Sequence, residues 1–260
     1  MILTHEDVFG KEEWEAAGKP MAISTASTGT DHIDVEYLEA QGVKVLCLLD
    51  DREALEEIRA SSEFTFMAIL MGLRRIQRLI GAHVRREPRF ELYNKIVGIV
   101  GLGRNGGNIW RWCEAFGAFP VYHDPYVRRA NTYPWGSIGI EELFAKSDVV
   151  VITCSLTDET RHMINIDLFK LMKENAVFVN TSRGAVINEK DLHRFLLQRH
   201  DVTAVIDVLE GENDNSHTSS PLWWLGNCIV TPHIAGHTVE SEAKANDIAT
   251  KLLYTDTDGE

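Results

Sequence analysis

Residues 95–106, Lys95-Ile-Val-Gly-Ile-Val-Gly101-Leu-Gly103-Arg-Asn-Gly106, decide the fold. An apolar strand runs directly into a G-x-G-x-x-G turn, and a helical stretch follows over residues 106–116. Gly101 permits the tight turn, Gly103 lets a pyrophosphate approach the backbone, and Gly106 lets the helix pack on the strand. The start of that helix offers N–H groups and a positive dipole end to phosphates.

A carboxylate follows the next strand. Residues 119–123 form an apolar run that ends at Asp124, about 20 residues beyond the turn, as in dinucleotide sites. A carboxylate there accepts both ribose hydroxyls and repels a 2′-phosphate, which favours NAD over NADP. Two alternatives stay open: a purely structural glycine turn, and a site for another adenosine ligand such as a methyl donor.

Short apolar strands alternate with helical stretches, which predicts an α/β fold with a mostly parallel, doubly wound sheet. Several strands are continuous apolar runs, as expected where helices cover both faces of a sheet. The expected strands are residues 21–25, 43–48, 96–100, 119–123, 149–153, 176–180, 203–206 and 228–231. The expected helices are residues 34–40, 52 to about 82, 106–116, 189–199 and 238–253.

Composition excludes several classes of protein. The 260 residues are 44% hydrophobic and 25% charged, which is ordinary for a globular chain and excludes extensive disorder. The most apolar uncharged stretch, residues 64–73, is far shorter than the roughly 20 residues that a membrane span needs. A net charge of −13 argues against a nucleic-acid partner, because phosphate contacts need a positive surface.

The cysteines and the first residues predict a cytoplasmic location. Residues 1–7 lack the basic region of a secretory signal. The four cysteines are far apart in sequence, so we expect reduced, buried thiols and no metal site. They are Cys47, Cys113, Cys154 and Cys228.

Three later strands each end in polar residues, at the sheet edge where α/β proteins bind ligands. Arg183 follows residues 176–180, Asp207 and Glu212 follow residues 203–206, and His233 follows residues 228–231. Each has an ordinary structural interpretation when taken alone: a salt bridge, loop charges, or a hydrogen-bonded core histidine. Together, they are the groups that support reduction of the ketone of a 2-oxo acid by hydride from a nicotinamide. Arg183 grips the carboxylate and polarises the carbonyl, and His233, supported by Glu212, donates the proton.

With these motifs, residues 22–253 resemble the D-isomer-specific 2-hydroxyacid dehydrogenases. The matching motifs are Ser27-Thr-Gly29-Thr-Asp-His-Ile-Asp34, Gly101-x-Gly103-Arg-x-Gly106, Phe116-Gly117, Asp124-Pro125, Asn180-Thr-Ser-Arg183-Gly184, Asp207-Val and Thr231-Pro-His233-Ile-Ala-Gly236. The resemblance implies an NAD-binding Rossmann domain over residues 94–236. Residues 1–93 and 237–260 then form a smaller, shortened, flavodoxin-like substrate domain, with the active site in the cleft between the domains. Members of this family are usually homodimers joined through the nucleotide domain.

The resemblance also assigns site residues. It implies a catalytic triad of Arg183, Glu212 and His233, and a turn over residues 27–29 whose backbone N–H groups meet the substrate carboxylate. The residues that it places at the substrate are Ser27, Thr28, Gly29 and Arg183. The residues that it places at the cofactor are Gly101, Gly103, Arg104, Asn105, Gly106, Asp124, Ser155, Thr157, Thr181, Asp207 and Gly236. Asp207 is expected to meet the nicotinamide carboxamide.

This chain departs from the family pattern at several positions. Fewer residues precede the Ser27 turn than is usual, so the sheet of the substrate domain is expected to be smaller. Ser155 stands where the family has a proline near the nicotinamide ribose. Asn105 replaces an aliphatic residue, which places its side chain near the pyrophosphate. Asn213 replaces a proline after the triad glutamate.

The sequence favours an NAD-dependent dehydrogenase that interconverts a 2-hydroxy acid and a 2-oxo acid. The second hypothesis is a non-catalytic NAD(H)-sensing protein on the same fold, either corepressor-like or a degenerate enzyme, motivated by the short substrate domain and the altered residues on the nicotinamide side. A different Rossmann enzyme, such as a methyltransferase, fits the strand ends at Arg183 and His233 less well.

Overall fold

The chain divides into two compact units. The computed structural model describes residues 1–3, 8–76, 88–127, 137–211 and 220–257. Met1–Ala60 and Gly236–Glu260 make up one unit, called the small unit below, and Ser61–Ala235 make up the other, the large unit. Each unit has its own parallel sheet.

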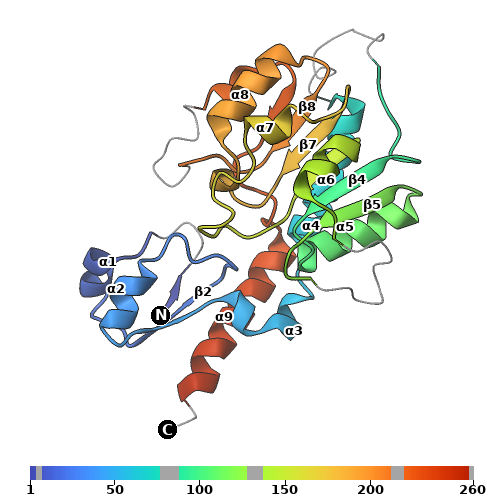
Figure 1. The fold of residues 1–260 in the computed structure, drawn as a ribbon. Helices are drawn as coiled ribbons and strands as arrows, with labels where there is room; N and C mark the ends of the chain where they lie inside the picture. The colour runs from blue at the N-terminus through green and yellow to red at the C-terminus, as the bar shows by residue number, and fades with distance from the viewer. Residues whose placement is uncertain (4–7, 77–87, 128–136, 212–219, 258–260) are drawn as a thin grey trace. The chain divides into compact units, whose positions relative to one another are not determined.

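Among the described residues, six parallel strands form the sheet of the large unit, in the order β5-β4-β6-β7-β8-β9 (Figure 1). They are β4 (Ile96–Val100), β5 (Phe119–His123), β6 (Val149–Ile152), β7 (Val177–Asn180), β8 (Thr203–Ile206) and β9 (Cys228–Val230). Ser137 adds an isolated parallel bridge to Tyr122 of β5. If Ser137 is counted as a further strand beside β5, the strand order is that of a doubly wound nucleotide-binding sheet. In such a sheet, the chain first adds strands on one side of β4 and then, from β6 onward, on the other side.

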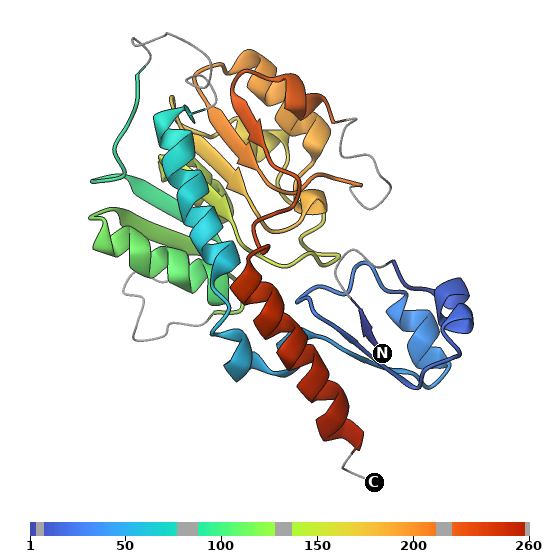
Figure 2. The ribbon, with the colours of Figure 1, turned by 180° about the vertical axis from the view of Figure 1, so that it is seen from behind.

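Helices cover both faces of this sheet (Figures 1 and 2). On one face lie α4 (Ala60–Arg74) and α5 (Arg104–Ala115), and on the other lie α6 (Ile140–Lys146), α7 (Ile166–Phe169) and α8 (Glu189–Gln198). Val149 and Val151 of β6 pack in the core under α4 and α5, whereas Val150 and Ile152 pack in the core under α6 to α8. Side chains alternate along a strand, so a run of apolar residues fills both cores.

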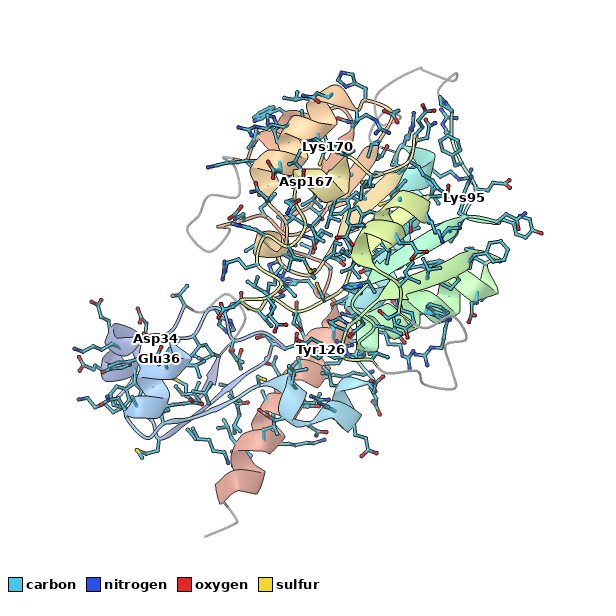
Figure 3. All side chains as sticks on the ribbon, in the orientation of Figure 1. Asp34, Glu36, Lys95, Tyr126, Asp167 and Lys170 are labelled. Carbon is cyan, nitrogen blue, oxygen red and sulfur yellow. The ribbon has the colours of Figure 1, made fainter. Side chains whose placement is uncertain are left out.

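The small unit is a three-stranded parallel sheet in the order β1-β2-β3. Its elements are β1 (Ile2–Leu3), α1 (Lys11–Ala16), β2 (Ala22–Thr25), α2 (Val35–Ala40), β3 (Lys44–Leu46), η1 (Leu48–Asp50), α3 (Arg52–Leu55) and α9 (Val239–Thr257). Trp14 and Leu38 of α1 and α2 share one core with Ile23 of β2. A second core joins η1 and α3 to α9 through Leu48, Leu55 and Ile248. Asp34, labelled in Figure 3, accepts from the N–H of Tyr37 and caps α2.

The predicted helix over residues 52–82 is not continuous. Its described part consists of α3 and α4, separated by residues 56–59, and residues 77–82 lie outside the described part of the chain. The interruption has a tertiary cause, because Ile58 is buried in a core of the small unit whereas the chain from Ser61 onward belongs to the large unit. α4 ends before Arg75, whose φ of 51° is left-handed and cannot continue the helix.

The large unit begins earlier than residue 94, where the sequence places the start of the nucleotide domain. α4 accounts for the difference, because Ala68, Ile69 and Leu73 are buried in the core that also holds Val97 and Ile99 of β4. An amphipathic helix adjoining the first strand is therefore part of the same compact unit. The assignment of the two units as nucleotide and substrate domains stays a prediction at this point.

The contact of α4 with the sheet depends on a glycine. A Cβ on Gly72 would lie 2.4 Å from Cγ1 of Val177, and 3.4 Å from Cγ2 of Val205. Gly72→Ala is therefore expected to lower the free energy of unfolding by about 1–3 kcal/mol through overpacking. Urea unfolding measures the change. Gly226→Ala, where a Cβ would meet nothing within 4 Å, is the matched control with an expected change within about 0.5 kcal/mol. Equal midpoints for both variants would contradict the close packing.

Candidate active site

The carboxyl ends of the parallel strands bring most of the predicted site residues of the large unit to one edge of its sheet. Gly101 follows β4, Asp124 follows β5, Arg183 follows β7 and His233 follows β9. Because all the strands are parallel, these ends share an edge, the usual ligand-binding edge of an open α/β sheet.

The glycine turn is closed on two sides by the backbone. Gly101 has a φ of 92°, and a Cβ there would lie 2.6 Å from the backbone nitrogen of Cys154. A Cβ on Gly106 would lie 2.2 Å from the carbonyl oxygen of Gly101. Thr153 Oγ1 donates to that same carbonyl at 2.6 Å. Both glycines are therefore required by the fold itself.

Gly103 is different, because a Cβ there would meet nothing within 4 Å. Gly103 caps α5, whose first internal backbone bond runs from the N–H of Gly107 to the carbonyl of Gly103. The N–H groups of residues 104–106 precede that bond, and the first turn carries no acidic residue. This open cradle at a helix start fits a pyrophosphate, whose charge the dipole and the N–H groups stabilise.

Asp124 is tied to the glycine turn. Its Oδ2 accepts from the N–H of Leu102 at 2.8 Å, and its Oδ1 accepts from the N–H groups of Tyr126 (labelled in Figure 3) and Val127 at 2.9 and 3.2 Å. The carboxylate thus fixes the distance between the ends of β4 and β5. Each carboxylate oxygen has two acceptor positions, so Asp124 can also accept from a ribose hydroxyl, and that contact stays a prediction.

Asn105 has a partner from a distant helix. Ser62 Oγ, in the first turn of α4, donates to Asn105 Oδ1 at 2.8 Å and accepts from Asn108 Nδ2 at 3.0 Å. Arg111 donates to Asn108 Oδ1, and a guanidinium can only donate, so the direction of the whole chain of bonds is fixed. The side-chain oxygen of Asn105 therefore faces Ser62, which leaves the amide Nδ2 as the group available for the predicted contact with the cofactor.

Arg183 is presented by a turn that a buried asparagine holds. Asn180, fully buried at the end of β7, donates from Nδ2 to the carbonyl of Arg183 at 3.0 Å. Its Oδ1 accepts from the N–H and the hydroxyl of Ser182 at 3.1 and 2.9 Å. A Cβ on Gly184 would lie 2.1 Å from the backbone of Leu209, so the next residue must be glycine. Arg183 itself stays half-buried at the sheet edge.

His233 is held by Asp207 in the same manner. Asp207 is 1% exposed, and its carboxylate accepts from the Thr231 hydroxyl and from the N–H groups of Ile234 and Ala235. The carbonyl of Asp207 also accepts from the N–H of His233 at 2.8 Å. These bonds stabilise the left-handed φ of 52° at His233. Asp207 is therefore a positioning residue for the histidine, and its predicted contact with the nicotinamide is untested.

The other predicted cofactor residues are distributed less uniformly. Thr181 Oγ1 lies 2.6 Å from Thr65 Oγ1 of α4. Thr157 Oγ1 lies 3.2 Å from Thr160 Oγ1, and Ser155 and Thr157 are both exposed after β6. Gly236 belongs to the small unit, where its carbonyl accepts from Ser241 Oγ at 2.5 Å. Glu212, the predicted triad carboxylate, and Asn213 lie outside the described residues.

The predicted substrate turn belongs to the small unit and follows β2. Within the described part of the chain, the four backbone N–H groups of residues 27–30 meet no acceptor. All four residues are half-buried. Successive unpaired N–H groups in a turn form a concave site for an anion such as a carboxylate.

Sequence reasoning missed the residues that hold these turns. Thr153, Asn180 and the buried pair Thr25 and His32 received no role of their own, although Asn180 and His32 stand inside the quoted motifs. Thr25, Thr153 and Asn180 share one signal, a polar residue at the end of an apolar strand, where partial or full burial favours a hydrogen-bonding role.

Other site classes find little support in the described residues. No group of three metal-ligating side chains gathers there, and no helix there is long and apolar enough to cross a membrane. Burial raises the pKa of the Cys113 thiol to about 12 and that of Cys154 to about 11, so neither is a ready nucleophile.

Comparison with known proteins decides the family. The family model described as "D-isomer specific 2-hydroxyacid dehydrogenase, NAD binding domain" matches residues 65–235. This chain belongs to that family. It is 33% identical over 251 residues to D-3-phosphoglycerate dehydrogenase of Methanocaldococcus jannaschii, covering 92% of this chain and 46% of that protein. It is 32% identical to human glyoxylate reductase/hydroxypyruvate reductase, covering 98% of this chain and 79% of that protein. The chain thus spans about half of the first relative and about four fifths of the second.

Solved structures agree with the fold of this family member. D-lactate dehydrogenase from Aquifex aeolicus, complexed with NAD and lactic acid, superposes with a TM-score of 0.83 at 27% identity, covering 99% of this chain and 82% of that chain. The predictions of the family, of the α/β Rossmann-type fold and of NAD as the cofactor are confirmed. The match also places α4 from residue 65 with the NAD-binding domain, as its packing does.

Gly103 and Gly106 are expected to respond differently to substitution by alanine. Gly103→Ala puts a methyl group into the open cradle, so NADH binding should weaken about tenfold or more, or at least 1.4 kcal/mol, while stability changes by less than about 0.5 kcal/mol. In Gly106→Ala the Cβ would lie 2.2 Å from the Gly101 carbonyl oxygen, so this variant should instead lower the free energy of unfolding. NADH fluorescence titration and urea unfolding separate the two effects. Full NADH affinity in Gly103→Ala would exclude the cradle as the phosphate site.

Proposed function

We propose that this chain is an NAD-dependent dehydrogenase that transfers a hydride between NAD(H) and a 2-hydroxy acid/2-oxo acid pair. One observation carries the proposal. Two buried polar side chains, Asn180 and Asp207, each fix a turn, and these turns present Arg183 and His233 at the sheet edge that also holds the glycine turn. A site in which buried polar groups hold the functional groups in place is characteristically preorganised.

Each polar group then has a distinct role. The Arg183 guanidinium binds the substrate carboxylate and polarises the neighbouring carbonyl. His233 donates a proton to the carbonyl oxygen, and Glu212, which lies outside the described residues, is the carboxylate assigned to support it. Bound NADH supplies the hydride that reduces the carbonyl carbon. The product is the 2-hydroxy acid, and His233 takes the proton back when the reaction runs in reverse.

The turn over residues 27–30 supports an acid as the substrate. Its four unpaired N–H groups offer directional donors to a carboxylate without adding a charge. We assign binding of the carboxylate of the 2-oxo acid to the N–H groups of this turn. The small unit is then the substrate domain, and the large unit is the NAD-binding domain.

Turnover tests the proposal directly. NADH oxidation is followed with glyoxylate, hydroxypyruvate, phosphohydroxypyruvate, pyruvate, phenylpyruvate and 2-oxoglutarate. His233→Ala should lower kcat by about 10²–10⁴-fold, because the proton donor is lost. Arg183→Ala should lower kcat/KM by about 10²–10³-fold, because a preorganised cation is lost. Both variants should bind NADH like the wild type, because the glycine turn is untouched.

Arg194→Ala is the matched control for these variants. Arg194 lies on α8 with its side chain 73% exposed, so its loss should leave turnover unchanged. Full turnover in either Arg183→Ala or His233→Ala contradicts the assigned roles. NADH binding by a folded wild type without turnover of any 2-oxo acid contradicts the dehydrogenase and favours the NAD(H)-sensing alternative.

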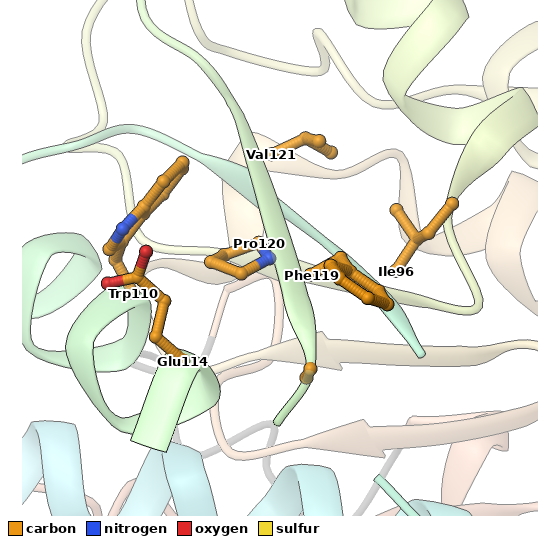
Figure 4. A pocket seen from close by; sticks show the side chains of 7 residues that line it. Ile96, Trp110, Glu114, Phe119, Pro120 and Val121 are labelled. Carbon is orange, nitrogen blue, oxygen red and sulfur yellow. The ribbon is translucent and has the colours of Figure 1, made fainter. Parts of the chain in front are cut away.

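We also propose a cytoplasmic homodimer. The cytoplasmic location is supported by the four cysteines, none of which forms a disulfide. The dimer is supported by exposed aromatic residues beside the outer strand β5, where Tyr93, Phe116 and Phe119 are 62%, 52% and 58% exposed. A hollow of about 260 Å³ lies beside them, lined by residues that include Trp110 and Pro120 (Figure 4). It lies away from the carboxyl ends of the strands, so it suits a protein contact better than catalysis.

Sedimentation equilibrium tests the dimer. The wild type should sediment at twice the chain mass of 29.3 kDa, and Phe119→Glu should shift it toward the monomer, because a charge on an apolar interface is costly. A wild type that sediments only at the chain mass would contradict the dimer.

A further inference from the structure

A string of hydrogen bonds runs under the turn of residues 27–30. Ser27 Oγ donates to the carbonyl of Gly29 at 2.5 Å. Thr25 Oγ1 lies 3.1 Å from Ser27 Oγ and 3.2 Å from Nε2 of His32. Thr25 is fully buried and His32 is 7% exposed. The string therefore connects a buried imidazole to the backbone of the turn.

The direction of each bond follows from its last acceptor. A carbonyl oxygen can only accept, so the single hydroxyl proton of Ser27 is committed to Gly29. Thr25 must then donate its own proton to Ser27, and Thr25 Oγ1 can only accept from His32. His32 is accordingly a donor from Nε2, which both the Nε2–H tautomer and the imidazolium provide.

The backbone of His32 is also anchored independently of the string. Its carbonyl accepts from the N–H of Phe9 at 2.9 Å, and the N–H of Ile33 closes the turn onto the carbonyl of Thr30 at 3.0 Å. The imidazole is thus held on a fixed backbone, and it can act as a rigid support for Thr25 and Ser27 rather than follow their movements.

We propose that His32 is a positioning residue for the substrate: it holds the turn, through Thr25 and Ser27, with its backbone N–H groups directed outward to a carboxylate. This inference rests on the proposed function. Unpaired, half-buried N–H groups cost free energy, so the turn would rearrange to satisfy them unless other contacts held its conformation. The carbonyl of Gly29, held by Ser27, is the group that the string immobilises.

The same directions define what the substrate meets. Because the Ser27 proton is committed to Gly29, the hydroxyl of Ser27 cannot donate to the carboxylate. The donors are the backbone N–H groups, whose placement depends on the string and not on the identity of the side chains at residues 28 and 30. His32 thereby affects carboxylate binding without touching the reacting atoms.

The experiment compares four variants of the full chain with the wild type. His32→Leu removes the donor, His32→Gln retains an N–H donor at a similar reach, and Thr25→Val interrupts the string at its centre. Thr250→Val is the matched control, because Thr250 loses only a bond to Asn246 within α9. The probes are the best 2-oxo acid substrate for KM and kcat, oxalate as a non-reducible dicarboxylate for equilibrium binding to the NADH complex, and NADH alone.

Loss of one hydrogen bond in the string should weaken carboxylate binding about 5–10-fold. His32→Leu and Thr25→Val should raise both KM and the oxalate Kd by that factor, with kcat within about twofold, because the string does not touch the reacting atoms. His32→Gln should restore both constants to within about twofold of the wild type. NADH affinity should not change, and Thr250→Val should match the wild type throughout. Thermal unfolding shows that each variant is folded at the assay temperature.

Three results overturn the inference. Wild-type oxalate affinity in His32→Leu shows that the turn needs no support from the imidazole. Failure of a folded His32→Gln to recover affinity shows that the ring packs rather than donates. A wild type that turns over 2-oxo acids while only kcat responds to the substitutions gives the residue another role. By contrast, a wild type that neither binds oxalate nor reduces any 2-oxo acid overturns the proposed function, and this inference with it.

Discussion

The close approach of α5 to the end of β4 is the constraint on which the predicted nucleotide site depends. A Cβ on Gly106 would lie 2.2 Å from the Gly101 carbonyl, so the helix can start there only because glycine occupies both positions. That approach leaves the Gly101 carbonyl facing Thr153 of the β6 end, and Leu102 facing Asp124 of the β5 end. The ends of β4, β5 and β6 are thereby held together around one turn. Gly103 is the residue of this turn at which a Cβ would meet no other atom within 4 Å.

At the other half of the same sheet edge, buried polar side chains hold the turns. Asn180 and Asp207 are buried at the ends of β7 and β8, where an unsatisfied polar group would be costly. Each instead forms hydrogen bonds with several backbone groups of the turn that it holds, and these bonds offset the free-energy cost of burying the polar side chain. Removing such a side chain leaves both the turn and its partners unsatisfied, which is why these residues matter beyond their own hydrogen bonds. Arg183 and His233 are thereby positioned while they stay only half-buried themselves.

The sequence was sufficient for the elements that carry a strong local pattern. Apolar runs such as residues 149–152 and the glycine turn predicted the central strands, α5 and the ligand-binding edge. The structure departs from expectation where distant contacts decide. The helix predicted over residues 52–82 is interrupted as the chain leaves the small unit, although no proline or glycine marks residues 56–59. The partner of Asn105 is Ser62, on a helix that local periodicity cannot place. Short elements such as β1 and α7 carry too few residues for a periodic signal.

This chain has a net charge of −13, belongs to an NAD-binding family and is proposed to act on an acid. Binding of two anions by such a chain must depend on short-range donors. The repulsion of distant carboxylates is screened within about 8 Å at physiological ionic strength, whereas a hydrogen bond acts at about 3 Å. Three features of the described residues fit that requirement. The start of α5 offers backbone N–H groups and no acidic residue, Arg183 offers a planar cation, and residues 27–30 offer N–H groups alone. Since backbone donors carry no mobile side chain, their orientation must come from neighbouring residues. Asp124 beside the glycine turn, Asn180 beside Arg183 and the Thr25–His32 pair beside residues 27–30 supply it, each through hydrogen bonds that join segments which would otherwise move separately.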